Sequence, residues 1–228
     1  MNTKNPFAQL TRFEWGLWLC SMLVILLCFF LSPNKDILNT LTSLIGVTSL
    51  ILLAKGAWHG HVLMIVFALL YGLIALHFRY WSEVLTYVGM TLPLSVISLI
   101  AWVRNPYKES GEVRVARLSR RQLLLLPPLA IAVTLLFFFL LQLLKTPNLI
   151  FSTLSITTSF VAAYLTFCRS SFFALGYAVN DVVLIALWVL ATLTSPGYLP
   201  MVICFCVFLC NDLYGFFAWR KMQKRQRE

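Results

Sequence analysis

The stretch LLLLPPLAIAVTLLFFFLLQLL, residues 123–144, decides the class of fold. It holds 22 residues and no charged side chain. A helix rises about 1.5 Å per residue, so about 20 mostly apolar residues are needed to cross the roughly 30 Å hydrocarbon core of a bilayer. A surface helix of a soluble domain instead carries a polar face along its length. The stretch therefore predicts a transmembrane helix.

Seven more apolar stretches of similar length flank this one. They are residues 15–31, 37–54, 62–78, 84–103, 148–167, 172–193 and 198–219. Charged residues make up only 11% of the 228, against about 25% in soluble domains, and the mean hydropathy is +0.85. No stretch alternates polar and apolar residues, which excludes β-barrel strands. We predict an all-α membrane protein with eight transmembrane helices.

The 18 Lys and Arg residues divide unevenly between the two sides of such a bundle. With a cytoplasmic N-terminus, Lys35, Arg79 and Lys145 fall outside, and the remaining 15, from Lys4 to Arg227, fall inside. Basic residues accumulate in cytoplasmic segments of membrane proteins. We therefore expect both termini in the cytoplasm. The net charge of +10 reflects this topology, and we expect no nucleic-acid partner.

The two halves of the chain resemble each other. Thr48-Ser49 corresponds to Thr158-Ser159 at a separation of 110, and Ala101-Trp102 corresponds to Ala218-Trp219 at a separation of 117. Spans two to four are thus repeated, in the same orientation, as spans six to eight, and the fifth span links them. Parallel repeats of this kind form the SWEET-like fold, which binds substrate near mid-membrane between the repeats.

These repeats set the expected domain organisation. Residues 1–36 form a cytoplasmic leader and a peripheral first helix, and residues 37–104 form the first three-helix repeat. Residues 105–147 are a cytoplasmic loop and the linker helix. Residues 148–222 form the second repeat, and residues 223–228 are a basic cytoplasmic tail. The architecture is an extra N-terminal helix plus a 3+1+3 parallel-repeat core.

Polar residues inside the spans are the candidate functional residues. Asn180-Asp181 and Asn211-Asp212 lie within the last two spans, and an Asp at a span centre costs roughly 2.5–3.5 kcal/mol unless something compensates it. Tyr177, Asp181 and Trp188 follow helical spacing and share one face, with Asn180 beside it. This stripe suits a pocket that stacks a flat ring and hydrogen-bonds a polyol. The alternative is a polar clamp that only joins helices.

The last two spans also carry a family resemblance. YAVNDVVLIALW (177–188) followed by YLPMVICFCVFLCNDLYGFFAW (198–219) resembles the second half of the PnuC vitamin transporters, the nicotinamide riboside uptake family. YGLIAL (71–76) resembles the start of the family's third helix. Many members have a substrate-associated Gln two residues after the Pro of the fourth span. Pro93 occupies that Pro position here, and Ser95 stands in place of the Gln.

The resemblance implies a bacterial inner-membrane transporter that equilibrates nicotinamide riboside by facilitated diffusion. A cytoplasmic kinase would then trap the substrate as its phosphate, and the protein would assemble as a trimer. The riboside has a positive charge, a flat ring, a carboxamide and a ribose. Trp188 would stack the ring, Asp181 or Asp212 would offset the charge, and Asn180 and Asn211 would bind polar edges. The remaining implied binding residues are Tyr71, Ser95, Tyr177 and Tyr214.

Three alternatives stay open at this point. The same fold could carry thiamine, riboflavin or a deoxynucleoside, which relatives transport. A membrane enzyme could use Asp181 and Asp212 as a carboxylate pair, although the Gly-x-Gly-Asp pattern of aspartyl intramembrane proteases is absent. The chain could also be a scaffold. It has no P-loop, G-x-S-x-G or H-E-x-x-H motif, so we expect no enzyme activity, no cofactor and no metal.

Overall fold

The computed structural model describes residues 6–32, 35–77, 81–108, 110–146, 148–194 and 196–228; Lys4 and Arg79 lie outside these residues. Within the described part, eight helical segments are long and apolar enough to cross a membrane, which confirms the predicted all-α class. In chain order the elements are η1 (Pro6–Gln9), α1 (Arg12–Leu31), α2 (Ile37–Ala54), α3 (His59–His77), α4 (Trp81–Val84), η2 (Leu85–Thr91), α5 (Leu92–Val103), α6 (Arg120–Leu143), α7 (Leu149–Phe167), α8 (Phe173–Thr194), η3 (Pro196–Tyr198) and α9 (Leu199–Arg225).

α1 and α6 begin three residues before their apolar stretches because a capping box starts each of them. The Thr11 hydroxyl accepts from the Glu14 backbone N–H, and the Glu14 carboxylate accepts from the Thr11 N–H. Ser119 and Gln122 form the same pair at the start of α6. Such a box satisfies backbone donors that a helix start otherwise leaves unpaired. Hydropathy cannot detect this polar first turn.

The fourth span is made of three pieces. α4 continues into η2, a π-helical segment that ends just before α5. The Leu92 N–H bonds to the Tyr87 carbonyl, five residues back, and Pro93 follows at the start of α5, where its missing N–H is harmless. Proline tends to kink a helix, and the wide π turn lies directly before Pro93. Pro127-Pro128 lie inside α6, which continues through both.

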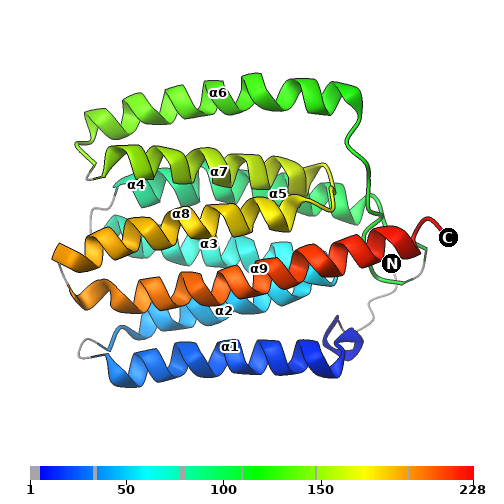
Figure 1. Ribbon diagram of the computed structural model, residues 1–228, viewed down its shortest axis with the longest axis horizontal. Helices are drawn as coiled ribbons and strands as arrows, with labels where there is room; N and C mark the ends of the chain where they lie inside the picture. Colours follow the sequence, from blue (N-terminus) through cyan, green and yellow to red (C-terminus); the bar gives the residue numbers. More distant parts are fainter. Residues whose placement is uncertain (1–5, 33–34, 78–80, 109, 147, 195) are drawn as a thin grey trace.

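The helices lie side by side along one long axis (Figure 1). α1 and α6 form the two opposite edges of the bundle, and the other helices lie between them. α3 packs between α2 and α5, and α8 packs between α7 and α9. We call α2, α3 and the fourth span (α4, η2 and α5) the first trio, and α7, α8 and α9 the second trio. The two trios meet where α2 contacts α9 and where α5 contacts α7. The first helix of each trio thus contacts the last helix of the other, as a two-fold relation between parallel repeats requires.

Equivalent ends of α2 and α7 support this relation. Two residues after its last helical residue, each helix is followed by a residue with positive φ, Gly56 (68°) after α2 and Arg169 (56°) after α7. The carbonyl of each accepts a backbone bond from the loop between the trios, from Val113 and Ala116 respectively, at 2.9 Å. Gly56 and Arg169 are 113 positions apart, so the Thr-Ser correspondence at 110 is about one helical turn out of step with the structure.

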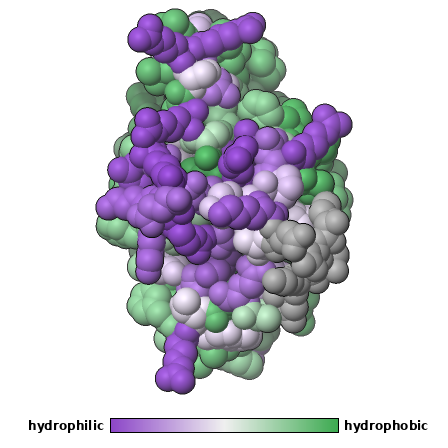
Figure 2. Space-filling model, turned by 90° about the vertical axis from the view of Figure 1, so that its right-hand side faces the viewer, coloured by the Kyte–Doolittle hydropathy of each residue, from purple (hydrophilic) through white to green (hydrophobic). Residues whose placement is uncertain are grey.

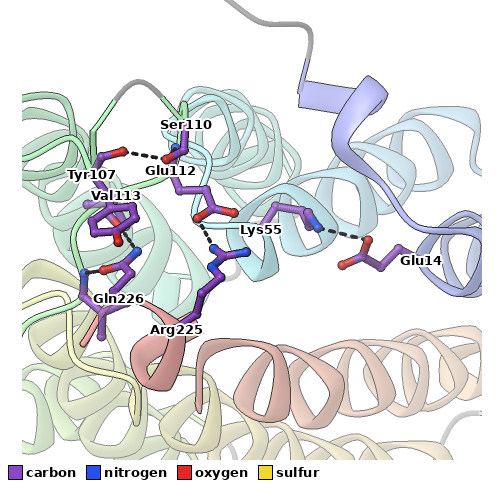
Figure 3. A network of polar contacts seen from close by, with 9 residues as sticks. Glu14, Lys55, Tyr107, Ser110, Glu112, Val113, Arg225 and Gln226 are labelled. Atoms are coloured by element: carbon purple, nitrogen blue, oxygen red, sulfur yellow. Dashed lines mark hydrogen bonds and ion pairs between the residues drawn. The ribbon is translucent and has the colours of Figure 1, made fainter. Parts of the chain in front are cut away.

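η1, the first described element, and the C-terminus lie at one end of the bundle, which we call the basic end (Figure 1). Figure 2 shows hydrophilic residues gathered over this end. The loop between α5 and α6 is held here: Glu112 pairs with Arg225, and Gln226 bonds the backbone of Val113 and Val115 (Figure 3). These contacts hold the loop against the C-terminal end of α9.

Candidate functional site

An inner cavity lies between the two trios. It has a volume of about 90 Å³ and is lined by residues from α2, α3, α4, η2, α7, α8 and α9. Six sequence-predicted residues line it: Tyr71, Tyr177, Asn180, Asp181, Trp188 and Asp212. Their separation along the chain, from α3 to α9, means that folding brings them together. The volume is below the range of roughly 300–1,000 Å³ that is typical of small-molecule sites, so a nucleoside-sized ligand requires the walls to move apart.

Asp181 and Asp212 form a carboxyl pair in this cavity. They come from the adjacent helices α8 and α9, are 4% and 5% exposed, and lie within hydrogen-bonding reach of each other. Two buried carboxylates at such a separation repel, so the pair is stable when it shares one proton. No protein donor among the described residues reaches the Asp181 Oδ2 atom. The pair can therefore carry one negative charge into the middle of the bundle.

Asn180 is oriented by a neighbour on α7. The Thr158 hydroxyl donates to the Asn180 side-chain oxygen at 2.9 Å, and Asn180 itself is 7% exposed. This bond occupies one lone pair of the amide oxygen and orients the side chain, and the amide nitrogen is the group that can donate to a ligand acceptor. A fixed amide of this kind suits a carboxamide or hydroxyl oxygen.

Aromatic side chains cover much of the remaining wall. The Tyr71 and Tyr87 rings lie 4.3 Å apart, and Phe67 contacts both at 5.7 Å. Trp188 lines the cavity from α8, and its ring lies 5.4 Å from that of Tyr198. Flat aromatic faces attract both stacked rings and cations.

Three predicted binding residues are not among the described residues that line the inner cavity. The Asn211 amide donates to the Ser21 hydroxyl of α1 at 2.9 Å, and the Tyr214 hydroxyl donates to Glu14 of α1 at 2.7 Å. Ser95 is buried in α5 and is not among the cavity-lining residues. Neighbouring residues on a helix point about 100° apart, and α1 covers the side of α9 that carries Asn211.

The structure also places residues at the cavity that are not in the predicted binding set. Ser152, Ser155 and Ser159 line the cavity from α7, at spacings of three and four, and this helical stripe was a detectable signal. η2 contributes Thr86, Tyr87 and Thr91. Its π geometry, which rotates residues relative to a continuous α-helix, has no simple sequence signature. Glu83 lines the cavity from α4. Within the described residues, no three His, Cys, Asp or Glu side chains form a metal-binding group.

The comparison with known families decides the class of protein. A family model described as nicotinamide mononucleotide transporter matches residues 36–221. The chain belongs to this family. It is therefore a multi-pass membrane transporter and not an enzyme. The expected membership of the PnuC group is confirmed by this match and by the relatives that follow.

One curated relative is the nicotinamide riboside transporter PnuC of Neisseria mucosa. It is 24% identical over 228 residues, which cover 97% of this chain and 86% of the relative. The crystal structure of the vitamin B3 transporter PnuC matches with a TM-score of 0.81 at 22% identity. That match covers 95% of this chain and 94% of the other. The structural match shows that the fold is shared over nearly the whole length of both chains.

Proposed function

We propose that this transporter takes up nicotinamide riboside. The observation that carries the proposal is the composition of the inner cavity. It is lined by aromatic rings and by the carboxyl groups of Glu83, Asp181 and Asp212, and no Lys, Arg or His is among its described lining residues. A cationic, flat, hydroxylated ligand matches such a wall. The name of the Neisseria mucosa relative supports the same substrate.

The cavity favours the riboside over the mononucleotide that the family name mentions. A phosphate group adds roughly 1.5–2 negative charges at neutral pH and requires basic side chains or backbone donors to replace its water. In the described lining, the charged groups are carboxyls, which repel a phosphate. We therefore expect the riboside to bind at least about a hundredfold more tightly than the mononucleotide.

We assign ligand contacts to the six predicted residues that line the cavity. Trp188 would stack on the nicotinamide ring, and the Asn180 amide would donate to the carboxamide or the ribose. The proton-sharing pair Asp181 and Asp212 would balance the positive charge. Tyr71 and Tyr177 would close the aromatic wall from α3 and α8. Ser95, Asn211 and Tyr214 are not included in this assignment.

We infer that transport is facilitated diffusion. The chain has no P-loop, so hydrolysis of ATP by this chain does not drive the step. Net uptake would depend on a cytoplasmic kinase that converts the riboside into its charged phosphate. In proteoliposomes, counterflow of labelled riboside should proceed without an ion gradient and should be unaffected by ionophores. Counterflow that stops when the ion gradient is dissipated would instead indicate ion coupling.

We propose the topology and assembly that the charge distribution and the family resemblance imply. The basic end would face the cytoplasm of a bacterium, with both termini there, and the opposite end would face outward across the inner membrane. Residues 37–104 and 148–222 would be the two repeats, residues 105–147 would be the cytoplasmic loop and the linker helix between them, and the protein would form a trimer. Cysteine labelling from each side and mass measurement in nanodiscs test these statements.

A ligand panel on purified protein tests the substrate. Tryptophan fluorescence should show saturable binding of nicotinamide riboside, and much weaker responses to its mononucleotide, thiamine, riboflavin and a deoxynucleoside. Trp188→Ala should abolish riboside binding, whereas Trp81→Ala, at a Trp that is 45% exposed and not among the residues lining the cavity, should not. If another ligand of the panel binds more tightly than the riboside, that ligand and not the riboside is the substrate.

A further inference from the structure

A second, larger cavity opens at the end of the bundle opposite the basic end. We call it the vestibule; its volume is about 620 Å³, within the usual range for small-molecule sites. It is lined by residues of α1, α2, α3, α4, α8 and α9 and by the turns before α2 and α9. Among the described residues, the vestibule and the inner cavity share Tyr71, Glu83 and Trp188. These three residues form a neck between the two spaces.

Glu83 is the charged member of this neck. In the vestibule the other charged residues among the described lining are Lys35 and Asp36, and in the inner cavity they are Asp181 and Asp212. Lys35 and Asp36 are both exposed and adjacent in sequence, so their charges largely offset each other. Glu83 is half-buried beside aromatic rings, where the dielectric screening is weaker than in water. A ligand that enters from the vestibule therefore meets one carboxylate at the neck before it reaches the inner pair.

A cation that leaves water needs such a partner. An organic cation that moves into an aromatic cavity loses its hydration, and this costs free energy unless an anion or ring faces compensate. Trp188 supplies a ring face at the neck, and Glu83 supplies the opposite charge at the same place. A neutral ligand of the same shape gains from the ring but gains nothing from the carboxylate.

We propose that Glu83 recognises the positive charge of the substrate at this neck and makes the transporter select a cationic nucleoside over a neutral one of the same shape. This inference rests on the proposed function. It deepens that function by assigning charge selection to a residue that neither sequence motifs nor the composition of the central helices single out. Asp181 and Asp212 lie deeper, and Glu83 acts first along the route from the vestibule.

Paired ligands and paired variants test the proposal. The ligands are nicotinamide riboside and the C-linked benzamide riboside, which keeps the flat ring, carboxamide and ribose but has no charge. Affinities are measured by calorimetry on the full chain in detergent. Glu83→Gln should weaken binding of the cationic ligand by about tenfold to a hundredfold and change the neutral ligand by less than about threefold. Glu83→Asp, which keeps the charge, should retain most of the preference for the cation.

Glu112→Gln is the matched control, because Glu112 bonds Arg225 at the basic end and lines neither cavity. Its affinities should match the wild type. Equal loss of both ligands in Glu83→Gln would show a purely structural role and overturn the inference, as would unchanged affinity for the cation. Both results leave the proposed function intact if the wild type binds the riboside. Failure of the wild type to bind it would overturn the proposed function and this inference together.

Discussion

The rings of Trp102 and Trp219 lie 5.2 Å apart, and each indole donates to a carbonyl of the other trio. Trp102 on α5 donates to the Thr166 carbonyl of α7 at 3.0 Å, and Trp219 on α9 donates to the Leu53 carbonyl of α2 at 2.8 Å. Both side chains are buried, at 1% and 0% exposure. This reciprocal pair joins the two trios near the basic end, and it explains why the sequence keeps a Trp at the end of both spans.

The reciprocal bonds predict equal effects of equal substitutions. Trp102→Phe and Trp219→Phe should each lower the free energy of unfolding by about 1–3 kcal/mol, because each loses one buried hydrogen bond and leaves a small void. Trp81→Phe, at an exposed Trp, should be nearly neutral. Denaturant titration in mixed micelles measures all three. A large effect of one buried Trp with none of the other would contradict the two-fold equivalence.

The two asparagines of the last spans should behave differently. Asn180→Ala should weaken riboside binding by about tenfold, because it removes an oriented amide from the cavity wall. Asn211→Ala should leave affinity close to wild type and should lower stability by about 1–2 kcal/mol, through loss of its bond to Ser21. Calorimetry and thermal unfolding separate the two effects. If Asn211→Ala loses riboside binding while its thermal stability is unchanged, Asn211 is a binding residue.

The carboxyl pair predicts a contrast between an amide and an apolar replacement. Asp212→Asn can still donate a hydrogen bond to Asp181 and should unfold at nearly the wild-type temperature. Asp212→Leu leaves Asp181 buried without that partner and should cost about 1–3 kcal/mol. Thermal unfolding in detergent compares the two. If both variants are equally stable, the pair does not share a proton.

Glu14 fastens α1 to the core through several bonds. It accepts from Tyr214 of α9 at 2.7 Å, pairs with Lys55 at the end of α2 at 3.2 Å, and caps α1 through Thr11 (Figure 3 shows the pair with Lys55). Glu14→Ala should therefore lower the free energy of unfolding by about 1–3 kcal/mol. Glu14→Gln keeps an acceptor for Tyr214 and should lie in between. An Ala variant as stable as the wild type would mean that α1 is held by apolar packing alone.

Much of the fold was predictable because the bilayer restricts what a chain can do. Backbone groups in hydrocarbon must bond within their own segment, so a run such as residues 123–144 has only the helix available. The predicted bounds of α2, residues 37–54, agree with the structure. The predicted first residues of α1 and α6, 15 and 123, are three residues too late. The helices begin at Arg12 and Arg120, directly after the capping residues Thr11 and Ser119. Hydropathy alone cannot predict where a helix begins when its first turn is polar.

The candidate site was predictable only in part. A helical period places Tyr177, Asp181 and Trp188 on one face of α8, and the structure places all three at the inner cavity. The same period cannot say which side of α9 faces inward, because that depends on the neighbouring helix. α1 covers the side with Asn211, and Asp212 is left to face Asp181. Glu83 lies one residue before the apolar stretch of residues 84–103, so a hydropathy argument does not place it in the bundle.

By itself the sequence determined the membrane class, the eight spans, the repeat and the family, because these follow from apolar length, charge placement and local motifs along the chain. Tertiary structure decided which polar residues share a cavity. Neighbouring residues on a helix point about 100° apart, so membership in a site depends on what packs on each side. It also decided that Glu83 lines a neck between two cavities, because α3, α4 and α8 meet there only after the two trios have packed.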